Sequence, residues 1–293
     1  MRPGLGLALA ACTWLMSAGG LHVAAADGVR VETAARALQP GELVVFSVTA
    51  PPDATAVSVL AAGAVIPAVR TPAGAWRALV GLDLALSPGQ FPTTVTTHTR
   101  GAVITTEHSL TVAPKRFPTR RLTVNPALVE PPPSELERIK RETARTNGIY
   151  ASPAPDVLWT ERFVRPVAAQ ANSRFGSRSI FNGGQRSSPH TGADFLSGAG
   201  TPIKAPNAGR VRLAENLYFS GNTVIIDHGQ GLFSLFAHLS AFEVHEGDSV
   251  AAGDVVGLVG ATGRVTGPHL HWAVRANGAR IDPLSLLAVL GPE

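Results

Sequence analysis

Six of the nine histidines in this 293-residue chain fall in its last third or so: His190, His228, His238, His245, His269 and His271. Two of them stand close together in Gly267-Pro268-His269-Leu270-His271-Trp272. From position 269 to 274 the even-numbered residues are large and apolar, which predicts a strand that buries Leu270, Trp272 and Val274. His269 and His271 would then share the opposite face. Because a strand rises about 3.4 Å per residue, the two imidazoles would lie about 7 Å apart.

That separation suits a division of labour between the two side chains. One imidazole can coordinate a metal ion while its neighbour exchanges protons with the attacking water, as in hydrolytic metal sites. The stretch His190-Thr191-Gly192-Ala193-Asp194 offers an imidazole and a carboxylate four positions apart. His190, Asp194 and His271 would supply three protein ligands and leave a fourth position open, which is typical of catalytic zinc. Two imidazoles and one carboxylate suit Zn²⁺, and we expect one ion per chain.

Each of these residues has a simpler interpretation when taken alone. A histidine on a strand is commonly a hydrogen-bonded surface residue, and an aspartate after glycine is commonly a turn residue. The combination with His269 and His271 favours a metal site. His228, between Asp227 and Gly229, is predicted to cap a turn, with a place in the cleft as the alternative.

A glycine-rich stretch, Gly257 to Gly263, has the composition of a nucleotide-binding loop. Its glycines follow the spacing G-x-x-G-x-x-G, and it has no P-loop lysine. We therefore expect tight turns between strands and no nucleotide.

The first 26 residues have the pattern of an export signal: Arg2, an apolar run from Leu5 to Met16, and Ala24-Ala25-Ala26 before the expected cleavage. The protein is therefore predicted to be exported, either to a periplasm or out of the cell. A lipid anchor at Cys12 is the alternative, because Leu9-Ala10-Ala11-Cys12 resembles a lipobox. Apolar residues continue beyond Cys12, which favours the cleavable signal. No later run approaches the roughly 20 apolar residues of a membrane-spanning helix.

The charge of the chain is mildly positive. The formal net charge is +4, and it falls by one if Arg2 leaves with the signal. A small excess of arginine suits contact with an anionic polymer such as cell wall. No basic run is interleaved with aromatic residues, so nucleic acid is not an expected partner. No pattern in the sequence indicates an oligomeric state.

The rest of the chain is predicted to be mostly β. Short β-type runs separated by turn residues over 27–115 predict an N-terminal immunoglobulin-like β-sandwich. Residues 116–160 read as a Pro-rich and helical linker, in which Ser134 and Glu137 would form a capping box and Glu137 would pair with Arg141. Residues 161–290, dense in turn signals, predict a second unit built of antiparallel β-strands.

Three motifs carry a family resemblance. His190-x-x-x-Asp194, Phe236-Ala237-His238-Leu239 and Gly267-Pro268-His269-Leu270-His271 resemble, in the same order, the motifs of the M23 (lysostaphin-like, LytM-type) zinc metallopeptidases. The resemblance implies an M23 peptidase fold over 161–290 and zinc ligands at His190, Asp194 and His271. It implies catalytic roles for His238 and His269, and a β-rich domain often precedes the peptidase in exported members.

The function implied by this resemblance is that of an exported zinc metalloendopeptidase, which would hydrolyse peptide bonds of peptidoglycan cross-links or stems. The alternative is a non-enzymatic LytM-type regulator, since some relatives keep the fold, lose ligands and activate cell-wall amidases. All five motif positions are occupied here, which favours the enzyme. We also hypothesise that residues 27–115 position or restrict access to the cleft.

Overall fold

The structure is a computed structural model that describes residues 23–26, 28–123, 129–159, 162–171, 175–184 and 186–291. The predicted export signal and the lipobox at Cys12 lie outside these residues, apart from Val23–Ala26, which form strand β1. No helix among the described residues has the length and apolarity needed to cross a membrane.

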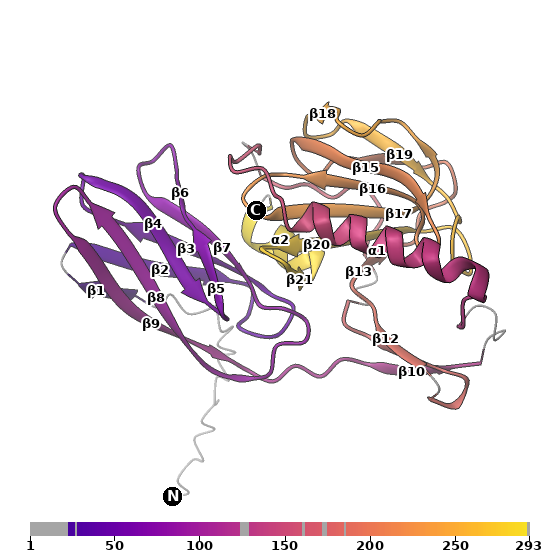
Figure 1. The fold of residues 1–293 in the computed structure, drawn as a ribbon, viewed down its shortest axis with the longest axis horizontal. Helices are drawn as coiled ribbons and strands as arrows, with labels where there is room; N and C mark the ends of the chain where they lie inside the picture. Colours follow the sequence, from indigo (N-terminus) through magenta and orange to yellow (C-terminus); the bar gives the residue numbers. More distant parts are fainter. Residues whose placement is uncertain are drawn as a thin grey trace, which may run out of the picture.

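The N-terminal unit is a sandwich of two antiparallel sheets (Figure 1). One sheet has the order β1-β2-β3-β7-β6 and the other has the order β5-β4-β8-β9. The strands after β1 are β2 (Val29–Ala35), β3 (Leu43–Thr49), β4 (Ala54–Ala61), β5 (Ala64–Pro67), β6 (Val69–Arg70), β7 (Trp76–Gly81), β8 (Gly89–Thr99) and β9 (Val103–Val112). Inward-facing residues of both sheets, among them Phe46, Val59 and Val95, form one apolar core. The immunoglobulin-like assignment stays a prediction, and this strand order agrees with it.

The C-terminal unit is built on one large, mostly antiparallel sheet with the order β13-β20-β17-β16-β15-β18. Strand β19 pairs with β14 and β17, and β21 pairs with β20. The elements are β13 (Gly192–Phe195), β14 (Pro202–Lys204), β15 (Gly209–Leu217), β16 (Gly221–Asp227), β17 (Leu232–Phe242), β18 (Ser249–Val250), β19 (Val255–Val259), β20 (Leu270–Ala276), β21 (Ala279–Ile281) and helix α2 (Pro283–Leu290). The expected alternation in β20 is confirmed, because Leu270, Trp272 and Val274 are buried in the core.

The predicted linker does more than connect the two units. Strand β10 (Thr119–Leu122) pairs in parallel with β11 (Arg178–Phe181), and β11 pairs with β12 (Arg186–Pro189). This three-stranded sheet leads directly into His190. The linker also contains the short 3-10 helix η2 (Pro133–Glu135), which directly precedes helix α1 (Leu136–Tyr150). A second 3-10 helix, η3 (Asn182–Gly184), follows β11.

The helix starts differently from the sequence expectation. Residues Pro133–Glu135 form η2, so α1 begins at Leu136 and its N-cap, Glu135, makes no capping hydrogen bond through its side chain. The capping box is therefore wrong. Arg138 instead forms ion pairs at helical spacing with Glu142, 2.6 Å away, and with Glu135, 3.7 Å away, and the expected Glu137–Arg141 pair is absent from the described part of the chain.

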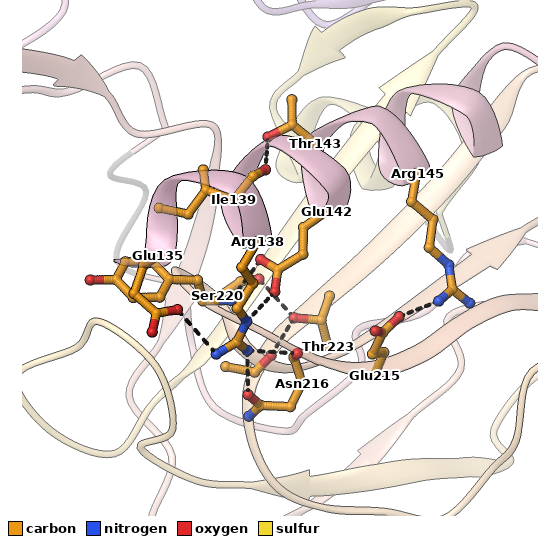
Figure 2. Close-up of polar contacts among 12 residues, drawn as sticks. Glu135, Arg138, Ile139, Glu142, Thr143, Arg145, Glu215, Asn216, Ser220 and Thr223 are labelled. Carbon is orange, nitrogen blue, oxygen red and sulfur yellow. Dashed lines mark hydrogen bonds and ion pairs between the residues drawn. The ribbon is translucent and has the colours of Figure 1, made fainter. Parts of the chain in front are cut away.

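Helix α1 lies across the outer face of the large sheet (Figure 1). Its last turn buries Ile149 against Leu213, Ile225 and Phe233. Figure 2 shows the polar side of this contact: Arg138 donates to the side chain of Asn216, 3.0 Å away. The Glu142 carboxylate accepts from the backbone N–H of Tyr218 at 2.8 Å, which ties the helix to the turn between β15 and β16.

The two units share a continuous core. Leu43, Val45 and Leu79 of the sandwich belong to the same buried apolar cluster as the core of the large sheet. The backbone N–H of Leu43 donates to the hydroxyl of Ser285, 2.9 Å away, on α2. Because apolar side chains of one unit fill the core of the other, we expect the two units to unfold together.

Arginine–carboxylate pairs surround this shared core. Arg36 bridges Glu42 and Asp282 at 2.7 and 2.8 Å. Arg280 makes a two-pronged contact with Asp83 at 2.6 and 3.0 Å. Those bonds outweigh the effect of burial and lower the pKa of Asp83 to about 2, so the carboxylate is charged at neutral pH.

Candidate metal centre

The structure brings His190, Asp194 and His271 together. The Nε2 atom of His190 lies 2.9 Å from Asp194 Oδ1 and 3.0 Å from His271 Nδ1. The Nδ1 atom of His271 lies 3.1 Å from the same carboxylate oxygen. These are the residues the motifs singled out, and within the described chain they form a group able to hold one metal ion.

The three ligand atoms fit a small tetrahedral ion. Ligands about 2.0–2.2 Å from zinc lie about 3.3–3.5 Å from one another, and the three atoms here are already within 2.9–3.1 Å. A carboxylate oxygen, which only accepts, and two ring nitrogens, which accept when unprotonated, also converge on one point. A divalent cation at that point would satisfy all three.

The protonation of the cluster favours metal binding as well. Burial alone would raise the pKa of Asp194, but contacts with His190 and His271 outweigh it and hold that pKa well below its usual range. Burial also lowers the pKa of His271, against the opposing effect of its contact with Asp194. Metal ligands must be deprotonated carboxylate and neutral imidazole, and these shifts favour both forms.

Strand pairing positions two of the three side chains. In the register of β13 with β20, Asp194 lies directly opposite His271, so their side chains share one face of the sheet. Gly192 leaves room for the His271 ring. A Cβ atom at position 192 would lie 2.7 Å from His271 Cε1 and 2.5 Å from the carbonyl oxygen of Trp272. Any other residue there would push against the ring that holds Nδ1.

His238 enters the site through an irregularity in β17. The pairing of β16 with β17 shifts between Asn222 and Val224, which leaves one extra residue on the β17 side. His238 sits in this bulge with a φ of 66°, a left-handed conformation that costs a β-carbon-bearing residue energy and is concentrated at functional sites. The bulge turns the imidazole toward His269, with 5.1 Å between ring centroids.

Both His238 and His269 have a defined tautomer. His238 Nδ1 lies 2.9 Å from the carbonyl oxygen of Thr262, and His269 Nδ1 lies 2.9 Å from that of Gly267. Because a carbonyl only accepts, each Nδ1 carries the hydrogen and each Nε2 is left with a lone pair. The Nε2 atom of His269 is 3.7 Å from Asp194 Oδ1. Burial, reinforced by the neighbouring histidines, lowers the pKa of His238 to about 4, so its ring is neutral at pH 7.

Thr262 is a residue that the sequence did not single out. It lies in the glycine-rich stretch, where the expected tight turns are only partly present: Gly257–Val259 belong to strand β19, Gly260 forms a β-bridge with His269, and the chain leaves the sheet only after Gly260. Its hydroxyl donates to the carbonyl of Leu239 at 2.8 Å and accepts from the backbone N–H of Asn222 at 2.9 Å. These bonds hold the carbonyl that orients His238. The density of glycines marked the turn, but nothing in the sequence indicated which carbonyl would face the histidine.

His228 lies outside the site. It is completely buried, with Nδ1 2.8 Å from the carbonyl of Ala208 and Nε2 2.9 Å from the hydroxyl of Ser234. Its ring also meets Phe163 edge to face. His228 is therefore part of the interior, and neither turn capping nor lining the cleft describes it. Burial lowers its pKa to about 4.

The group formed by His190, Asp194 and His271, called the metal cluster below, lies in a groove of about 670 Å³. All of its described lining residues follow residue 149, so the sandwich supplies none of them. One wall carries Phe219, over whose ring the Arg264 guanidinium lies at 4.5 Å. The floor continues from His271 along β17 and β20 to Tyr150 at the end of α1.

Comparison with known proteins agrees with this site. Residues 188–283, which include all five motif residues, match the model of peptidase family M23. The chain is 45% identical over 104 residues to the DD-carboxypeptidase/endopeptidase Mpg of Neisseria meningitidis serogroup B, a match that covers 36% of this chain and 24% of that protein. It is 37% identical over 113 residues to the peptidoglycan DD-endopeptidase ShyA of Vibrio cholerae, covering 39% of this chain and 26% of ShyA. These matches thus span about a quarter of the curated relatives.

A solved structure is similar over a much longer stretch. A Pseudomonas aeruginosa protein described as peptidase M23 is 34% identical, with a TM-score of 0.67, and the similarity covers 87% of this chain and 96% of that one. Such coverage includes most of the sandwich as well as the large sheet. With the family match over the metal cluster and this similarity over almost the whole relative, the chain belongs to peptidase family M23.

Proposed function

We propose that this protein is an exported zinc metalloendopeptidase that cuts peptide bonds in peptidoglycan, at cross-links or in stems. The observation that carries the proposal is the convergence of His190, Asp194 and His271 within 3.1 Å, in one groove with two further imidazoles that each present Nε2. In this proposal the first three residues hold one Zn²⁺, and His238 and His269 are catalytic.

Bound zinc would polarise the scissile carbonyl and lower the pKa of a water molecule to about 7. The protein's own residues supply the remaining chemistry. Neutral His238 accepts a proton at Nε2, because Thr262 keeps its Nδ1–H engaged. His269 presents Nε2 on the same side of the cluster, so it can donate a proton to the leaving amine or stabilise the oxyanion once it is protonated. Asp194 stays ionised and orients both ligand histidines.

The substrate class is supported by the relatives. ShyA is named a peptidoglycan DD-endopeptidase and Mpg a DD-carboxypeptidase/endopeptidase. We extend the DD-endopeptidase activity named for ShyA to this chain, with a D-alanyl cross-link as the bond cut. The net charge of +4 suits an anionic polymer. The proposal also includes the division of the chain: an export signal over 1–26, an N-terminal unit over 27–115, a linker over 116–160 and a peptidase unit over 161–290.

The test combines metal content with product analysis. The full chain and its His271→Ala variant are purified, their zinc is measured by atomic emission, and each is incubated with sacculi. We expect about one zinc per wild-type chain, as a three-ligand site predicts, together with a fall in cross-linked muropeptide dimers. The variant should lose both. Stoichiometric zinc without cleavage would refute the enzyme and support the amidase-activating regulator.

A further inference from the structure

The groove extends well beyond the metal cluster along the outer face of β20. In this strand the half-buried odd-numbered residues His271, Ala273 and Arg275 line the groove, together with the buried Val274. The other even-numbered residues are buried and do not line it. Ala237 and Leu235 of β17 line it alongside them. Small side chains near the metal and a guanidinium at the far end make a shallow, directional channel.

Arg275 is held at the end of this channel by its neighbours. Its guanidinium carbon lies 4.4 Å from the centre of the Tyr150 ring, and one of its nitrogens donates to the carbonyl of Gly278 at 3.1 Å. Tyr150 in turn packs edge to face on Phe233, with 5.3 Å between centroids. Arg275 also makes a side-chain hydrogen bond to Tyr150. The guanidinium is therefore fixed on an aromatic residue, and the contacts with Gly278 and Tyr150 use two of its five N–H donors.

The charges around Arg275 do not balance. In the pairing of β20 with β21, Arg275 lies directly opposite Arg280, and like charges in that position are destabilising. Asp83 neutralises Arg280 through a two-pronged contact. No ion pair joins Arg275 to a carboxylate among the residues that the structure describes.

We propose that Arg275, fixed on Tyr150, forms a subsite for a carboxylate of the substrate peptide. This inference rests on the proposed function, because it places the peptide in the same groove as the metal cluster. A planar guanidinium binds carboxylate through two parallel hydrogen bonds, and a carboxylate in that position would supply the missing negative charge.

The position of Arg275 sets the distance between the cut bond and the recognised group. Arg275 lies four positions after His271 on one strand, which corresponds to about 14 Å at a rise of about 3.4 Å per residue. An extended peptide laid along β20 has a similar rise. The subsite therefore selects peptides that carry a carboxylate about 14 Å from the scissile carbonyl.

The experiment pairs a protein variant with a modified substrate. Cross-linked stem-peptide dimers released from sacculi are used in their free-acid form and after conversion of their carboxylates to amides. KM and kcat are measured for the wild type and for Arg275→Gln. Binding of the cleavage product, whose free amine is chemically blocked, is measured by calorimetry. Arg141→Gln, an exposed arginine on α1 outside the groove, is the matched control.

We expect the wild type to bind the free-acid form at least about tenfold more tightly than the amide, since a charge-assisted hydrogen bond has that weight. Arg275→Gln should weaken binding of the free acid by a similar factor and no longer distinguish the two forms. Its kcat should change less than its KM. Arg275→Lys should restore part of the preference, because the charge returns without the planar fork.

A purely structural role for Arg275 would weaken binding of both forms equally, and a preference left intact in Arg275→Gln would overturn the proposal. If the wild type cleaves neither form, the proposed function fails by itself. Binding of the intact dimers then still tests the subsite, and equal affinity of the wild type for both forms would refute it.

Discussion

Replacement of Gly192 by alanine should weaken zinc binding without unfolding the protein. The new Cβ would lie 2.7 and 2.8 Å from two atoms of the His271 ring and 2.5 Å from a backbone oxygen. Ordinary contacts begin about 0.6–0.9 Å farther away, so the ring has to shift by a comparable distance, while metal ligands tolerate displacements of only about 0.2 Å. The backbone at Gly192 is not left-handed, so this cost is steric and not conformational.

We expect zinc affinity to fall at least about tenfold, with a loss of unfolding free energy of about 1–3 kcal/mol from overpacking. Affinity is measured by competition with a chromogenic chelator and stability by denaturant unfolding of the metal-free protein. Gly198→Ala is the control, because a Cβ there has no atom within 4 Å. If Gly192→Ala binds zinc as tightly as Gly198→Ala while losing stability, strand β13 has moved instead of the ring and the reasoning fails.

Three further predictions concern His228, Thr262 and Leu79. His228 has a pKa near 4 in the folded protein and about 6.5 in the unfolded chain, so the unfolded chain takes up the proton first as pH falls. The contribution of neutral His228 to the free energy of unfolding should therefore be fully present above pH 6.5 and fall by about 3 kcal/mol toward pH 4. Denaturant unfolding of the metal-free protein at pH 7 and 4.5 should show this loss, and His228→Asn should remove the part due to His228, leaving the part due to His238, whose pKa is also near 4. A pH difference that is unchanged in His228→Asn would contradict the assignment. Thr262→Val removes the hydroxyl that anchors the loop beside His238, and should lower kcat about tenfold while zinc content stays constant. Leu79→Ala should cost about 2–5 kcal/mol and lower one common calorimetric transition of both units, whereas two separate transitions would show that the shared core does not couple them.

The sequence predicted the residues of the candidate site more accurately than the strands and helix that surround it. Alternation in β20 correctly predicted the buried Trp272, and the three motifs named the residues that the fold brings together. Strand β10 was missed because Thr-Arg-Arg-Leu has no apolar alternation, and its partner in β11 stands about 60 residues later. The bulge at His238 was missed for a different reason: it arises from the pairing of β17 with β16, and histidine, although enriched in the left-handed region, adopts that conformation at only a minority of positions.

The predicted capping box does not form because the prolines that precede Ser134 have a competing local preference. Three prolines precede Ser134, and proline favours the first turn of a helix, which here becomes a 3-10 turn ahead of α1. Arg275 attracted no attention since an arginine at alternate positions of a strand usually faces water. Its place in the groove depends on α1 lying over the sheet, a contact between segments far apart in sequence.

The parallel pairing of β10 with β11 has a consequence for the order in which the chain matures. Parallel strands cannot be joined by a tight turn, and here the closing loop contains α1 and most of the linker. Closure of such a loop carries an entropic cost that is recovered only when β11 and β12 dock. The hairpin leading to His190 thus assembles late, and β20, which brings His271, is made later still. A nascent chain would therefore lack a complete metal cluster until β20 has been synthesised and paired with β13, so that metal binding is acquired late in folding.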